Sequence, residues 1–183
     1  MKHVMPAIRN YLFITVLTGL IYPLMMTAFA QGLFPWRANG SLVVKDGKVV
    51  GSRLIEQKFE NPKYFWGRPS AVDFNPLPSG GSNLGPTSAD LLKAAGERAK
   101  KFGQEGLSGV PQDLLFASGS GLDPEFSLEA ALFQLPRVAQ ARGVSEEKLR
   151  SIVAAHVVGR DLGFLGEPRI NVLELNLDLD DAR

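Results

Sequence analysis

Side chains that could carry catalysis or bind a metal are scarce in this chain. It contains two histidines, His3 and His156, and no cysteine, so a zinc site is not expected. His156 lies on an apolar helical face and no Gly-x-Ser-x-Gly motif accompanies it, which favours a structural histidine over a catalytic base. Asp178, Asp180 and Asp181 alternate with leucines and are interpreted as a solvated tail rather than a calcium loop. We therefore expect no catalytic residue, no metal ligand and no directly bound cofactor.

A glycine-rich segment is the next candidate for chemistry. Residues 79–86, SGGSNLGP, precede a predicted helix, so their backbone N–H groups could hold a phosphate. The segment lacks the Gly-Lys-Ser/Thr end of a P-loop, and a glycine-rich turn that shapes a surface is favoured. Arg68 could bind a carboxylate across an interface or hold its own loop, and the residues leave both open. Gln57 has no specific chemistry by itself.

These residues lie in a long segment that must position them. Residues 54–86 contain too many prolines and glycines for a helix. Their aromatic side chains, among them Phe59, Tyr64, Phe65 and Phe74, predict an ordered loop, because disordered segments are poor in aromatics. Long ordered loops are usually functional, and the part from Phe59 to Phe74 is a candidate contact surface.

The elements around this loop predict an α+β domain. A hairpin is expected where apolar residues flank Asp46-Gly47. About three helices are expected: from Thr87 or Ser88 to about Phe102, from Ser127 through Pro136 to Gly143, and from Ser145 onward. Pro136 is expected to kink or restart the second helix. Residues 170–179 alternate like a C-terminal strand, with an apolar register that switches near Leu173.

The segment from Tyr11 to Ala30 predicts a membrane helix. No charged residue lies between Arg9 and Arg37, and twenty helical residues span about 30 Å, the thickness of a bilayer core. Pro23 would interrupt the helix. Thr15 and Gly19 form a small-residue patch for packing against another membrane helix. The alternative is a signal peptide cleaved after Ala30, which would release a secreted periplasmic enzyme or ligand-binding domain.

We divide the chain into residues 1–36, an N-terminal tail and anchor, and residues 37–183, one extracytoplasmic domain. The short basic N-terminus, with Lys2 and Arg9, favours a cytoplasmic N-terminus and a domain on the outside. All 19 acidic residues follow the apolar segment, as do all basic residues except these two. The domain is therefore close to neutral, which offers no general attraction to nucleic acid.

Six ordered blocks resemble the KdpC family, the C subunit of the Kdp-type potassium-transporting P-type ATPase. The likeness covers essentially the whole chain. Glu56 stands where the family usually has glycine, and residues 73–78 are richer in proline than expected. The blocks are GSxLIxQxF (51–59), YFxGRPSA (64–71), SGGSNLGPT (79–87), ASGSGLDP (117–124), RVAxAR (137–142) and GEPxINVLxLN (166–176).

The resemblance implies a single-pass inner-membrane protein with a periplasmic domain. Its partners would be the potassium-channel-like A subunit, the ATP-hydrolysing B subunit and the small F subunit. The protein would be a non-catalytic accessory subunit needed for assembly and stability of the complex, with a possible role at the outer potassium entrance. The residues that the resemblance and the aromatic loop single out as a candidate interface or functional loop are Gln57, Phe59, Tyr64, Phe65, Arg68, Ser79, Gly80, Gly81, Ser82, Asn83, Gly119, Gly121 and Asp123.

Family members are described as catalytic chaperones that raise the ATP affinity of the B subunit. Residues 79–82, together with Gln57, are tied to that description by likeness to an ABC signature loop. A domain outside the cytoplasm cannot touch cytoplasmic ATP, so direct contact and the predicted topology exclude each other. We favour the topology, and expect any effect on ATP affinity to be a conformational coupling through the complex.

Overall fold

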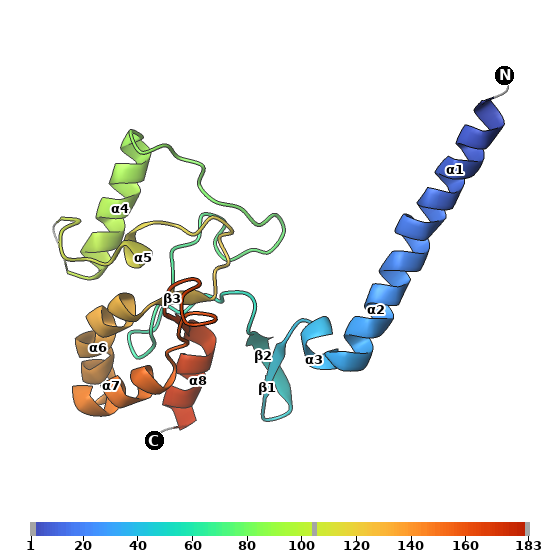
Figure 1. Cartoon of the computed structure of the whole chain (residues 1–183). Coiled ribbons are helices and arrows are strands. Elements are labelled where there is room, and N and C mark those ends of the chain that lie inside the picture. The colour runs from blue at the N-terminus through green and yellow to red at the C-terminus, as the bar shows by residue number, and fades with distance from the viewer. Residues whose placement is uncertain (1–2, 104–105, 182–183) are drawn as a thin grey trace. The chain divides into compact units, whose positions relative to one another are not determined.

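The computed structural model describes residues 3–103 and 106–181. The chain divides into two compact units, residues 1–50 and residues 51–183. Figure 1 shows a long helix and most of a hairpin in the first unit, and a mixed arrangement of helices and short strands in the second. The mixture of helices and strands agrees with the α+β prediction. The domain boundary placed after residue 36 stays a prediction.

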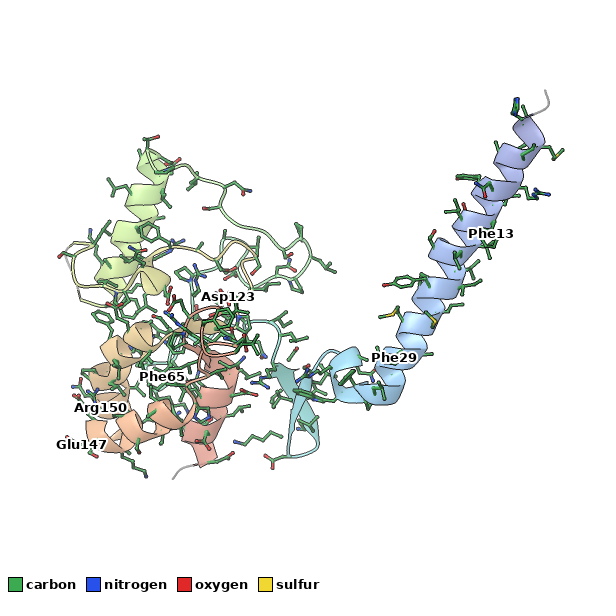
Figure 2. The ribbon with its side chains drawn as sticks, viewed as in Figure 1. Phe13, Phe29, Phe65, Asp123, Glu147 and Arg150 are labelled. Carbon is green, nitrogen blue, oxygen red and sulfur yellow. The ribbon has the colours of Figure 1, made fainter. Side chains whose placement is uncertain are left out.

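The first unit begins with one continuous helix. It consists of α1 (Val4–Val16), a π-helical turn η1 (Leu17–Ile21) and α2 (Tyr22–Leu33). This 30-residue helix, with mean hydropathy 1.9, is long and apolar enough to cross a membrane. Its side chains, including Phe13 and Phe29, point outward along its length (Figure 2). The helix extends beyond the predicted segment at both ends.

Pro23 does not end this helix. The π-helical turn directly precedes Tyr22 and Pro23, and its wider winding accommodates a residue that lacks a backbone donor. The hydroxyl groups of Thr18 and Thr27 donate to the carbonyls of Ile14 and Pro23, each at 2.8 Å. The polar atoms of both threonines are therefore satisfied within the helix, as an apolar solvent requires.

The predicted hairpin is confirmed. After the short helix α3 (Pro35–Ala38), β1 (Leu42–Lys45) pairs with β2 (Lys48–Ser52). Asp46 and Gly47 connect the strands with φ of 51° and 73°, the left-handed pair that a two-residue hairpin turn needs.

The second unit contains five helices and one two-stranded sheet within its described residues. The helices are α4 (Ala89–Lys101), α5 (Gln112–Leu115), α6 (Leu128–Arg142), α7 (Glu146–Ala155) and α8 (Val172–Asp181). The strands β3 (Glu125–Ser127) and β4 (Arg169–Asn171) pair antiparallel, with Phe126 opposite Ile170. In Figure 1, α6, α7 and α8 lie together, and α4 lies beside α5.

The three predicted helix starts are correct. The hydroxyls of Ser88, Ser127 and Ser145 accept hydrogen bonds from the third residue of α4, α6 and α7, which satisfies donors that a helix start leaves free. The sequence predicted that Pro136 kinks or restarts this helix. The helix does not restart there, because α6 runs through Pro136 to Arg142. Gly143 then ends the helix in the left-handed conformation.

The core of the second unit gathers around α6. Four of its side chains, Ala130, Ala131, Leu135 and Val138, are fully buried. They share one cluster with apolar residues of the other helices, of both strands, and with Phe65 from the long loop. Figure 2 places Phe65 among these packed side chains. A loop residue is therefore part of the core that the helices form.

The predicted C-terminal strand is wrong in most of its length. Only Arg169–Asn171 is strand, and Val172–Asp181 is α8. The side chain of Asn171 accepts a hydrogen bond from the backbone N–H of Glu174, which is the contact of a helix cap. The register switch near Leu173 thus marked a change from strand to helix, and the alternating leucines hid a helical pattern of buried Val172, Leu175 and Leu179.

Candidate functional site

The long loop is ordered without any helix or strand of its own. No regular element occurs between Ser52 and Ala89, which agrees with the prediction of an ordered loop. Two amide side chains replace the missing backbone partners. Asn176 of α8 accepts from the N–H of Phe65 and donates to its carbonyl, both at 2.9 Å. Gln134 of α6 does the same for Trp66, also at 2.9 Å.

Two arginines of α6 hold the same segment. Arg137 donates to the carbonyls of Pro62 and Tyr64, and its guanidinium lies 3.8 Å from the centre of the Trp66 ring. Burial lowers the pKa of Arg137 to about 10. Arg142 donates to the carbonyl of Lys63 and forms an ion pair of 2.9 Å with Asp180. Side chains of α6 therefore hold the loop at positions 62, 63, 64 and 66, and Asn176 of α8 holds it at position 65.

Asp180 was interpreted from sequence as part of a solvated tail, and this is wrong for that residue. It lies on α8, accepts a hydrogen bond from the hydroxyl of Tyr64 at 2.8 Å and pairs with Arg142. Partial burial opposes ionisation of Asp180, but these hydrogen bonds, together with the positive charges of Arg142 and Lys63, outweigh it and hold the pKa of Asp180 below its usual value. Asp178 is exposed.

The two glycine-rich blocks meet, although they are about forty residues apart in sequence. The N–H of Gly80 donates to the carbonyl of Ser120 at 2.9 Å, and the N–H of Ser118 donates to that of Pro69 at 3.1 Å. Gly121 has φ of 68°, and a Cβ there would lie 2.8 Å from the carbonyl oxygen of Gly80. We call residues 79–83 and 118–123 together the paired loops. Glycine is required at 121 because the two backbones approach so closely.

Charged groups lie beside the paired loops. Arg68 forms an ion pair of 2.9 Å with Asp123, which joins the long loop to residues 118–123 within the chain. A role of Arg68 at an interface stays a prediction. The carboxyl of Glu56 is buried, with 4 % of the residue exposed, against Gly67, where any Cβ would overlap its Oε1. Burial and the nearby Asp123 raise the pKa of Glu56 to about 9, against the opposing effect of Arg68.

A groove of about 550 Å³ opens next to Glu56. Its lining combines aromatic rings with charges of both signs. Within it, Lys58 pairs with Glu60 and Asp73, and Arg98 donates to the carbonyl of Leu115. Most of its charges are therefore engaged within the chain. The neutral Glu56 carboxyl can donate or accept a hydrogen bond, and its Oε2 has no partner among the described residues.

The predicted site residues fall into three groups. The structure brings together Arg68, Gly80, Gly81, Gly119, Gly121 and Asp123, while Ser79, Ser82 and Asn83 are exposed on the same loops. Phe59 and Tyr64 pack against each other, with ring centres 5.4 Å apart, next to α6 and α8, and Phe65 is a core residue. Gln57 lies against Gly51. Their functional roles stay predictions.

Sequence reasoning missed the side chains that hold the loop: Gln134, Asn176, Arg137, Arg142 and Asp180. Gln134 and Asp180 carry no pattern that separates them from surface residues. Arg137, Arg142 and Asn176 lie in two of the blocks that resemble the family, and that resemblance was the available signal. Glu56 was noted only as a departure from the family. Asn171 had a usable signal, because Asn171 and Glu174 have the spacing of a helix cap followed by an acidic residue three positions on.

His156 lies at the end of α7. Its Nδ1 is 3.0 Å from the carbonyl oxygen of Ile152 and its Nε2 is 3.9 Å from Asp178. Both contacts suit a half-buried structural histidine. Within residues 3–103 and 106–181, no group of three or more His, Asp or Glu side chains is arranged to hold a metal ion.

The apolar helix and the compact second unit together identify the general class of protein. A single apolar helix able to cross a bilayer, joined to a compact α+β unit whose polar groups hold its own loops, describes a membrane-associated protein with an extramembrane unit.

Comparison with known proteins then identifies the family. The family model KdpC, described as K+-transporting ATPase, c chain, matches residues 4–181. The chain is 53% identical to the potassium-transporting ATPase KdpC subunit of Sorangium cellulosum, with all of both chains covered. It is 54% identical to that of Geobacter sulfurreducens and 50% identical to that of Geotalea uraniireducens, with 98% of each chain covered in both cases. The chain belongs to the KdpC family.

Proposed function

We propose that this chain is the non-catalytic accessory subunit of an ATP-driven, high-affinity potassium uptake complex of the Kdp type, and that the complex needs it for assembly and stability. The observation that carries the proposal is the family match, which extends over both units from residue 4 to residue 181. Relatives covered over their whole length carry the name of a potassium-transporting ATPase subunit. The alternative, a secreted enzyme or ligand-binding domain released after Ala30, gains no support from these relatives.

The partners in this proposal are a channel-like A subunit, an ATP-hydrolysing B subunit and a small F subunit. The chain binds no cofactor directly, and ATP is used by the B subunit. We propose that an effect on ATP affinity reaches the B subunit as a coupling between conformations, and that the second unit acts near the outer entrance for potassium. The anchor lies in the inner membrane, with a cytoplasmic N-terminus and a periplasmic second unit. The basic N-terminus supports that orientation.

The paired loops remain the proposed contact region, and their geometry decides which substitutions test it. Arg68 is engaged with Asp123, and a side chain at Gly81 would lie 3.1 Å from the carbonyl oxygen of Gly119. Substitutions at either position therefore perturb the fold before they perturb an interface. Ser82 is exposed, so Ser82→Arg changes the surface alone.

The test is purification of the tagged full-length chain from its native membranes in mild detergent, followed by mass spectrometry of what co-purifies. We expect the A, B and F subunits, an intact N-terminus that still contains the apolar helix, and lower recovery of the A subunit with Ser82→Arg. A chain that begins at Gln31 and purifies alone would overturn the proposal. Equal recovery with Ser82→Arg would exclude only the paired loops as the contact region.

A further inference from the structure

The segment between α7 and β4 exposes three large apolar side chains at its tip. Leu162 is 83 % exposed, Phe164 69 % and Leu165 48 %. Folded proteins leave single apolar residues on their surfaces, whereas several exposed apolar residues close together are a feature of contact surfaces. We call residues 158–169 the apolar turn. None of its exposed apolar residues has a role in the loop contacts described above.

The apolar turn has a fixed shape. The carbonyl of Asp161 accepts from the N–H groups of Leu165 and Phe164, at 2.9 and 3.3 Å, and Asp161 donates to the carbonyl of Leu165 at 2.9 Å. At its base, Val158 and Arg169 exchange two backbone hydrogen bonds of 2.8 and 3.0 Å. The tip is therefore a short ordered hairpin and not a loose loop.

The residue at the tip is unfavourable for the turn it forms. Leu162 and Gly163 both have positive φ, at 54° and 84°, a pair for which Asn-Gly is strongly preferred. A leucine in the left-handed region costs about 1–2 kcal/mol, and here it gains little burial in return. Such a conflict between local preference and the observed residue is expected at functional positions.

The charges at the base of the turn help to decide what kind of surface the turn contacts. Arg160 pairs with Glu167, and Arg169 pairs with both Asp161 and Glu125. The turn therefore presents no excess of positive charge, which segments that lie on anionic lipid surfaces usually carry. A rigid apolar tip with neutralised charges at its base suits an apolar pocket of fixed shape, as partner proteins provide.

We infer that the apolar turn docks into an apolar pocket on the extramembrane surface of another subunit of the potassium-transporting ATPase, with Phe164 and Leu162 as its anchors. This inference rests on the proposed function and adds a second contact region, separate in sequence from the paired loops.

The first experiment measures complex recovery. Leu162→Asn with Phe164→Ser removes the apolar tip, and asparagine suits the positive φ at 162, so the thermal unfolding midpoint of the purified chain should not fall. Loss of two buried anchors is expected to reduce recovery of the other subunits about tenfold or more. The matched control is Leu92→Gln, which changes a leucine of α4 that is 64 % exposed and should leave recovery unchanged.

The second experiment locates the occupant, and does not depend on the fold of the double variant. The chain contains no cysteine, so Phe164→Cys can carry a benzophenone photocrosslinker at one position. We expect a crosslink to another ATPase subunit in the purified complex, and none from Leu92→Cys. Crosslinking to a second copy of the chain, or to phosphatidylglycerol in vesicles that contain this chain alone, would overturn the inference.

The two proposals fail differently. If the wild-type chain recovers no ATPase subunit, the proposed function is wrong. If the wild type and the Leu162→Asn/Phe164→Ser variant recover them equally, only the docking role of the apolar turn is wrong.

Discussion

Glu56 is the residue whose environment differs most from that of an ordinary carboxyl. It lies in the notch left by Gly67, its N–H donates to the carbonyl of Leu122 at 2.9 Å, and its side chain faces Asp123 and Arg68. Removing a carboxylate from water disfavours the charged form, so the group stays protonated in the folded chain at neutral pH.

Stability should consequently fall as pH rises. Below about pH 4.5 Glu56 is neutral in folded and unfolded chains. Between its ordinary pKa of 4.5 and about 9 only the unfolded chain releases the proton, which favours unfolding. We expect Glu56→Gln to raise the free energy of unfolding relative to wild type by an amount that grows across this window, measured by urea unfolding in detergent. Glu60→Gln, at an exposed position, is the control, and parallel pH profiles for wild type and Glu56→Gln would contradict the prediction.

The close approach of the two backbones at Gly121 also leads to a testable prediction. A Cβ there would meet Val72 Cγ2 at 2.7 Å and the Gly80 carbonyl oxygen at 2.8 Å, at a positive φ. We expect Gly121→Ala to destabilise the second unit by about 1–3 kcal/mol, seen as a lower thermal midpoint. Gly119→Ala is the matched control, because a Cβ at Gly119 meets nothing within 4 Å. Equal midpoints for the two variants would show that the loops can separate without cost.

At the scale of elements, α6 and α8 act as a frame for the long loop. Asn176 and Gln134 provide a donor and an acceptor to the backbone of consecutive residues, much as a neighbouring strand would. The buried Phe65 ring then ties the same segment to the core. An unpaired backbone group in such a place would cost about as much as a lost hydrogen bond.

Asn176→Leu should therefore be costly. It keeps the approximate size of the side chain but leaves the N–H and carbonyl of Phe65 without partners, at about 1–3 kcal/mol for each buried group. We expect a lower free energy of unfolding and faster amide exchange at Phe65. Gln140→Leu, at an exposed position of α6, serves as the comparison. Unchanged exchange at Phe65 in the Asn176 variant would mean that other groups hold the loop.

At the scale of the whole molecule, the apolar helix and the second unit meet different solvents. The helix from Val4 to Leu33 buries none of its apolar window inside the chain, and a lipid bilayer or partner helices would cover it. The packing of Thr15 and Gly19 against another membrane helix stays a prediction. Within this chain, a Cβ on Gly19 would meet nothing within 4 Å.

Topology is testable because the chain lacks cysteine. A Leu92→Cys variant, at an exposed position of α4 outside the proposed contact regions, should react with a membrane-impermeant maleimide in intact spheroplasts, and a His3→Cys variant only after the membrane is permeabilised. The expected result follows from a cytoplasmic N-terminus and an outer second unit. The reverse labelling pattern would place the second unit in the cytoplasm and reopen direct contact with ATP.

The sequence alone determined features that depend on neighbouring residues. The apolar helix, the Asp46-Gly47 hairpin and the starts at Ser88, Ser127 and Ser145 were predictable, because hydropathy, turn and capping preferences act over a few residues. The ordered loop was also predictable from its aromatics. The strand expected over residues 170–179 was wrong, since leucines at alternate positions fit a helix as well, and packing on the core decided between them.

Tertiary structure decided everything that depends on distant residues. The meeting of the paired loops, the amide contacts of Asn176 and Gln134, and the neutral state of Glu56 involve partners many positions away, which no local pattern records. Glu56 shows the reason most clearly. Its type predicts a charged surface residue, and only the absence of a side chain at Gly67 provides the space that buries it.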